Sequence, residues 1–221
     1  MNFRLPYPGL FSSAPDFIMA LTFLVTWIDP YALGDKMISY LLLIMLMEFI
    51  INHSSAFLGA AMFTENVKSK KVMMILGLGV LYSIFVSGFA LAFGEWWPFL
   101  AFWGMIANRM LSVLLGQSPE GKEKQVMGGM WLVNNVCYLV GVAVTIGTPL
   151  PSLGVTPDAI AHAGLTGGGL WIEEPYRVLA FGFIYFTAVG ISELTLIPWM
   201  GKLQFKMFDN FSNPSKNITP Q

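Results

Sequence analysis

The sequence predicts an all-α protein: a polytopic membrane bundle of about six transmembrane helices with both termini in the cytoplasm. Three observations carry this prediction: the composition, the length of the apolar segments and the placement of the lysines. Of the 221 residues, 55% are hydrophobic and only 11% are charged. Soluble domains average about 25% charged residues. The balance is therefore typical of a membrane protein and not of a soluble one.

The apolar segments are close to the length that crosses a bilayer, which is about 20 residues for a helix. We expect a single transmembrane domain over residues 1–200, followed by a disordered cytoplasmic tail over 201–221 because that composition is polar. The first helix is the weakest, since Asp29 and Pro30 interrupt its end. The six predicted helices cover approximately 15–33, 37–63, 72–94, 97–116, 126–148 and 178–200.

Positive charge is concentrated in alternate connections of the chain. The loops 64–71 and 118–124 are rich in lysine, whereas 34–36, 94–97 and the long outer loop 149–177 carry few positive residues. Loops rich in Lys and Arg stay in the cytoplasm. A count of six helices places both lysine-rich loops on one side, and a count of five would split them across the two faces.

The outer loop 149–177 contains one short predicted helix within "TPDAIAHAG". Thr156 is a suitable N-cap, Pro157 suits the first helical position and Gly164 is a suitable stop. The stretch "TGGGLW" that follows is predicted to be a flexible return.

Polar and charged side chains recur at one depth in the predicted spans. A charge in a membrane helix costs about 2.5–3.5 kcal/mol on insertion scales, so such residues usually face the bundle interior. With each span centred on the bilayer and about 1.5 Å of rise per residue, these residues fall within roughly 6 Å of the midplane. They predict a ligand or proton site formed by Glu48, Asn52, His53, Asn108, Arg109, Asn134 and Glu193.

Helical spacing divides the polar residues of the second span between two faces. Glu48, Asn52, Ser55 and Gly59 recur every three or four residues and share a face. His53 lies about 140° around the helix from Glu48, at roughly 100° per residue. Glu48 and His53 therefore point to different neighbours, which argues against a metal ion held by both.

The spans hold two glutamates for one arginine. Arg109 can pair bidentately with one carboxylate, and Glu193 is closer to it in depth than Glu48. We therefore expect an Arg109–Glu193 pair. Glu48 is then neutral, paired with protonated His53, or bound to a cation, because a buried carboxylate without a partner takes up a proton. The competing interpretation is that these contacts only hold the helices in register.

The sequence lacks the motifs of several classes of protein, including phosphate-binding, metal-binding and catalytic ones. It has no phosphate-binding loop, no H-E-x-x-H, no C-x-x-C and no catalytic motif, so we expect no metal and no cofactor. The single cysteine, Cys137, excludes an internal disulfide. No basic block suggests nucleic acid.

The preferred function is a small transporter or permease-like protein for protons or a small polar solute. The first alternative is a non-catalytic accessory or assembly subunit of a larger membrane complex. The second is an intramembrane enzyme with Glu48 and His53 as acid and base. The expected partners are the lipid bilayer and, as an open question, other membrane subunits or further copies of the chain. The compact loops favour a bacterial inner membrane.

Overall fold

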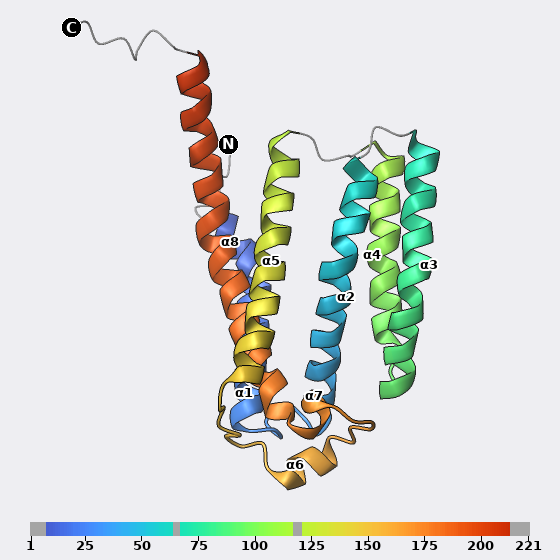
Figure 1. Ribbon diagram of the computed structural model, residues 1–221, viewed down its shortest axis with the longest axis vertical. Coiled ribbons are helices and arrows are strands. Elements are labelled where there is room, and N and C mark those ends of the chain that lie inside the picture. The colour runs from blue at the N-terminus through green and yellow to red at the C-terminus, as the bar shows by residue number, and fades with distance from the viewer. Residues whose placement is uncertain (1–7, 64–66, 117–120, 213–221) are drawn as a thin grey trace, which may run out of the picture.

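The computed structural model describes residues 8–63, 67–116 and 121–212, with side chains described over 13–61, 67–116 and 124–195. The described residues contain helices and turns but no strand. Six long helices run alternately up and down, and two short ones lie together at one end (Figure 1). Their bounds are α1 (Pro8–Ile28), α2 (Met37–Phe63), α3 (Lys68–Phe93), α4 (Trp97–Leu114), α5 (Lys122–Gly147), α6 (Pro157–His162), α7 (Leu170–Glu173) and α8 (Pro175–Ser212).

Four of the long helices are long and apolar enough to cross a membrane, namely parts of α2, α3, α5 and α8. They indicate a multi-pass integral membrane protein. The expected number was six. The apolar part of α1, Ser13–Ile28, is shorter than the four candidate spans. Helix α4 has only 18 residues, and these include Asn108 and Arg109, which lower its mean hydropathy. The helical class is thus confirmed for the described residues, and the count of six transmembrane helices is not.

The C-terminal ends of two helices differ from the predictions by five residues or more. Helix α1 ends at Ile28 and does not reach residue 33, because the residue before Pro30 is disfavoured in a helix. Helix α8 continues to Ser212, so residues 201–212 are helical where disorder was expected. The rest of the predicted tail, 213–221, lies outside the described residues.

The long helices form two groups that share α2. Helix α1 packs along α8, and α8 also packs against α5; on the other side α3 packs against both α4 and α2. Figure 1 shows α2 between the two groups. One apolar core joins α1, α2, α5 and α8, and a second joins α2, α3 and α4. Helix α2 is therefore buried on several sides, as expected of a helix that is apolar around its circumference.

The outward faces of α3 and α5 are apolar. Leu76, Val80 and Ile84 of α3 are exposed, as are Leu132 and Leu139 of α5. The buried residues of α3 recur at helical spacing, from Ile75 through Gly79, Tyr82 and Val86 to Ala90. A helix with one packed stripe and an apolar remainder suits a bundle surrounded by lipid.

The connection between α5 and α8 fastens onto the end of α1. The Trp27 side chain donates from Nε1 to the carbonyl of Pro151 at 3.0 Å, and the amide of Gly154 donates to the carbonyl of Trp27 at 3.1 Å. Any Cβ at Gly154 would lie 2.0 Å from the carbonyl oxygen of Ile28. Glycine is therefore required at this contact.

The short helix in this connection was predicted with its cap. The Ala159 amide donates to Thr156 Oγ1 at 3.2 Å, and Gly164 follows the helix with a φ of +63°. The glycine-rich return contains a further turn, α7, that was not predicted. It begins after Gly169, whose φ of +123° allows the chain to reverse there.

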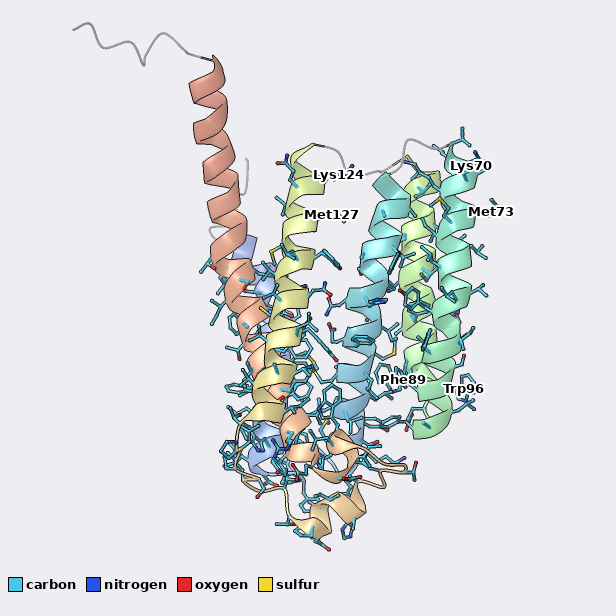
Figure 2. The ribbon with its side chains drawn as sticks, in the orientation of Figure 1. Lys70, Met73, Phe89, Trp96, Lys124 and Met127 are labelled. Atoms are coloured by element: carbon cyan, nitrogen blue, oxygen red, sulfur yellow. The ribbon has the colours of Figure 1, made fainter. Side chains whose placement is uncertain are left out.

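The lysines of the alternate connections gather at one end of the bundle. Lys70 and Lys124 lie at the end away from α6 and α7, whereas Trp96 lies toward the end that carries them (Figure 2). We refer below to the lysine end and the loop end. Helix α8 also finishes toward the lysine end (Figure 1).

Candidate functional site

A cavity of about 620 Å³ lies where the two helix groups meet. Five helices line it, because α1, α2, α4, α5 and α8 each turn polar residues toward it. The polar and charged lining residues are Asp16, Glu48, Asn52, Ser55, Arg109, Trp131, Asn134, Tyr185 and Glu193. This set includes five of the seven residues predicted from sequence.

One face of α2 supplies the longest polar row of the cavity. Glu48, Asn52, Ser55 and Gly59 all line it, as the helical spacing predicts. The same row continues from mid-depth toward the lysine end, because α2 runs in that direction (Figure 1). Met127 of α5 lines the cavity near Lys124 (Figure 2). The cavity therefore extends from the middle of the bundle toward the lysine end.

Tyr185 of α8 joins the two polar residues at the deep end. Asn52 donates from Nδ2 to the Tyr185 hydroxyl at 2.9 Å, and that hydroxyl donates to Glu48 Oε2 at 3.1 Å. The Trp131 indole donates to the backbone carbonyl of Asn52 at 2.9 Å. Three helices, α2, α5 and α8, are thus linked through side-chain hydrogen bonds at one depth.

Sequence reasoning missed Asp16, Trp131 and Tyr185. Asp16 lay at the very edge of the predicted first span, but α1 begins earlier, at Pro8, which carries Asp16 into the bundle. Tyr185 is the one tyrosine in a highly apolar part of the last span, and a buried tyrosine hydroxyl normally finds a partner. That rule would have pointed to the residue, although not to its partners.

The expected Arg109–Glu193 pair is wrong. Arg109 donates from Nη2 to Ser55 Oγ at 3.1 Å, and the ion pairs of the described side chains do not include one between Arg109 and a glutamate. Glu193 Oε2 and Asn134 Oδ1 are buried without a hydrogen-bond partner. Depth alone could not predict the pairing, since it also depends on how α4 and α8 are rotated about their axes.

His53 and Asn108 lie outside the cavity, contrary to the prediction. His53 Nδ1 is 2.7 Å from the Tyr82 hydroxyl, in a separate apolar groove of about 390 Å³ between α2 and α3. Asn108 is exposed. Both follow from helix geometry, because a residue one position from an inward-facing neighbour such as Arg109 points about 100° away. Glu48 and His53 therefore do not form an acid–base pair.

Aromatic rings fill the space between the cavity and the loop end. Tyr138 packs edge-on against Phe181 with ring centroids 4.8 Å apart, and against Tyr185 at 5.5 Å. Trp171 of α7 reaches Phe181 at 5.6 Å, and Phe186 packs on Tyr185 at 5.0 Å. We call these five residues the aromatic layer. The loop end of the cavity is thus packed by aromatic side chains.

The arrangement suits binding and proton exchange better than covalent chemistry or metal coordination. Three carboxylates approach the cavity from three helices, yet no group of three or more His, Cys, Asp or Glu among the described residues is close enough to hold a metal ion. Tyr185 and Asn52 fix the orientation of Glu48, which leaves its second oxygen available to a proton or a donor.

The comparisons with known proteins add no family to this geometry. The chain matches no protein-family model, no curated protein and no solved structure. Any statement about function therefore rests on the cavity and on the helices that form it.

Proposed function

We propose that the protein is a small transporter that binds a proton or a small polar solute in this cavity and carries it across the membrane. The observation that carries the proposal is the cavity itself, with Asp16, Glu48 and Glu193 reaching it from three helices. Intramembrane carboxylates are costly to insert and commonly mark ion or substrate pathways.

The position of the cavity supports the same proposal. It lies where the two groups of helices meet, beside α2, which contributes to both apolar cores. It extends toward the lysine end, and the aromatic layer packs its loop end. A site between two groups of helices is what a transporter needs if the groups move relative to each other and expose the site alternately.

We further propose six membrane crossings, with α1 and α4 as short additional spans and with both termini in the cytoplasm of a bacterial inner membrane. The lysine end would then face the cytoplasm, in agreement with the positive-inside rule. Tilt and local thinning of the bilayer accommodate hydrophobic stretches shorter than its thickness.

The test is proton flux into liposomes that contain the purified protein and a trapped pH-sensitive dye. Under an imposed pH gradient, Glu48→Gln should reduce the flux to the rate of empty liposomes without reducing the yield of folded protein. The control is Asp35→Asn, because Asp35 is an exposed carboxylate of the connection between α1 and α2. Wild-type flux in Glu48→Gln, together with a lower folded yield, would reduce the site to a packing contact.

One observation favours the accessory-subunit alternative. Helix α5 packs mainly against α8 and only slightly against α2, and its outward residues Val136, Leu139 and Val140 are apolar and exposed. A partner helix could cover this face as well as lipid does. Purification in a mild detergent separates the two cases, because a subunit would co-purify with another protein in a fixed ratio and a stand-alone transporter would not.

A further inference from the structure

The hydrogen-bonding groups of the cavity restrict the chemical class of its ligand. We propose that the cavity binds a small monovalent organic cation with N–H donors, a primary ammonium or a guanidinium carried on an apolar body. The inference rests on the proposed function for its biological meaning, since it names the solute that the same site would carry. Binding itself can be measured without transport.

Charge favours a cation at the deep end. The described lining holds three carboxylates, from Asp16, Glu48 and Glu193, against one guanidinium, from Arg109. Arg109 contacts Ser55, which follows Glu48 by seven residues and so lies about 10 Å nearer the lysine end at about 1.5 Å per residue. Arg109 therefore leaves the Glu48 level without a positive neighbour, and an anion would meet carboxylates there.

The donors of the deep end are already engaged. The Tyr185 hydroxyl donates to Glu48, the Asn52 amide donates to Tyr185, and the Trp131 indole donates to the Asn52 carbonyl. Two buried acceptors of the described cavity lining have no partner: Asn134 Oδ1, three residues from Trp131, and Glu193 Oε2. Glu193 follows Tyr185 by eight residues and so lies about 12 Å nearer the lysine end at about 1.5 Å per residue. A buried acceptor without a donor lowers stability. A ligand that brings its own N–H groups would supply a donor that these acceptors lack.

The rest of the lining suits an apolar body and not a bare inorganic ion. Ile51, Met130, Phe186 and Val189 line the cavity beside the Trp131 ring. An indole face attracts a desolvated cation. A volume of about 620 Å³ is that of a small organic molecule and far exceeds one dehydrated metal ion, and the described carboxylates form no metal cage.

Three probes that share a phenethyl body, together with the anion phenylacetate, separate charge from hydrogen-bond donation. The protein in lipid nanodiscs is titrated calorimetrically with phenethylammonium, its N,N,N-trimethyl analogue, phenethyl alcohol and phenylacetate. We expect phenethylammonium to bind and the trimethyl analogue, which is charged but has no N–H, to bind at least about tenfold more weakly. The alcohol and the anion should give no measurable heat of binding.

Two results would overturn the ligand class. One is binding of phenylacetate or phenethyl alcohol as tight as that of phenethylammonium. The other is the absence of phenethylammonium binding at millimolar concentration. Equal binding of the trimethyl analogue would refute the requirement for N–H donors.

Variants then place the binding in the cavity. Glu48→Gln and Glu193→Gln should each weaken phenethylammonium by about tenfold or more, since each removes one charge near the ligand. Arg109→Gln should tighten it, because repulsion is removed. The matched control, Asp35→Asn, removes a carboxylate outside the cavity. Thermal unfolding of each variant shows that it is folded; unchanged affinity in both folded glutamate variants would place the binding elsewhere and overturn the proposal.

The outcomes distinguish this inference from the proposed function. Proton flux that depends on Glu48 without phenethylammonium binding refutes the ligand class and leaves the transporter. Phenethylammonium binding that depends on Glu48, without any flux of proton or probe, refutes the transporter and leaves the ligand class.

Discussion

At the scale of single residues, Tyr185 holds the deep end of the cavity together. Its hydroxyl accepts from Asn52 and donates to Glu48, both on α2, and the residue is 2% exposed. One hydroxyl therefore serves as acceptor and donor in the same network. The contacts between α2 and α8 at this depth depend on it, because Glu48 and Asn52 lie on the same face of α2.

Replacing Tyr185 with phenylalanine should lower the free energy of unfolding by about 1–3 kcal/mol, because it leaves buried polar groups on Asn52 and Glu48 without their partner. Denaturant unfolding in detergent measures the change. The control is Tyr31→Phe, since Tyr31 is exposed and its hydroxyl contacts only Asp158 at 3.3 Å. An equal effect of the two substitutions would show that the network contributes nothing to stability.

The polar row of the second span was predictable from sequence, whereas its partners were not. Helical periodicity places Glu48, Asn52 and Ser55 on one face and His53 on another, and the cavity agrees. Asp16 was not predicted as a site residue, because its helix starts earlier than the apolar pattern does. The partner of Arg109 was not predicted, because pairing between helices depends on how each helix is rotated about its own axis. Periodicity within one helix does not define that rotation.

At the scale of elements, glycines set how closely the helices approach. A Cβ on Gly182 of α8 would lie 2.2 Å from Cε1 of Phe23 on α1, and one on Gly141 of α5 would lie 2.6 Å from Cε2 of Phe181. The structure shows that each receives an aromatic ring.

Gly182→Ala should therefore destabilise the protein by about 1–3 kcal/mol, because the methyl group overpacks the contact between α1 and α8. Gly88→Ala is the matched control, since no atom lies within 4 Å of the added Cβ on α3. The melting temperatures of both variants, measured in the same detergent, test this prediction. A similar melting temperature for Gly182→Ala and Gly88→Ala would mean that Phe23 moves aside freely.

An ion pair at the start of α8 connects that helix to the end of α5. Arg177 contacts Glu174 and donates from Nη1 to the carbonyls of Thr145 and Thr148, at 2.7 and 3.1 Å. A positive group at the C-terminus of a helix satisfies its last carbonyls and its dipole. Glu174 keeps Arg177 in place, and Tyr176 donates to the same carboxylate at 2.8 Å.

This contact should depend on pH. The hydrogen bond from Arg177 lowers the pKa of Glu174, which lies outside the spans. A carboxylate with a lowered folded-state pKa stabilises the protein above its unfolded pKa, and the effect is lost as the pH falls through the folded value. The difference in melting temperature between wild type and Glu174→Gln should thus be largest near neutral pH and shrink below about pH 4. A constant difference would contradict this.

The elements themselves were largely predictable, and the exceptions have local causes. The second predicted span coincides with α2, and Thr156 caps α6 as expected. Helix α7 was missed because "TGGGLW" has the composition of a flexible loop, although the Gly169 carbonyl accepts two amides there. The end of α1 was predicted five residues too late, at 33 instead of Ile28, although the sequence shows that Asp29 and Pro30 interrupt it.

At the scale of the whole molecule, the distribution of charge bears on the orientation in the membrane. Lys70 and Lys124 lie at the same end of the bundle, and Trp96 lies toward the other (Figure 2). If the lysine end is cytoplasmic, a cysteine at Lys70 should resist an impermeant thiol reagent in intact cells, in a background where Cys137 is alanine. A cysteine at Lys36, at the loop end, should react. Labelling of the first and protection of the second would invert the orientation.

The packing of α1 has a consequence for how the chain is made. Helix α1 lies along α8 and makes few contacts with α2, so α1 meets its main partner only after the helices between them have been made and α8 follows. The Trp27 carbonyl of α1 likewise gains its hydrogen-bond donor, the Gly154 amide, only after that later segment has been made. Contacts so distant in sequence form slowly. The cavity, lined by Asp16 of α1 and Glu193 of α8, is therefore completed only after α8 has been made, and a chain truncated before α8 cannot build it.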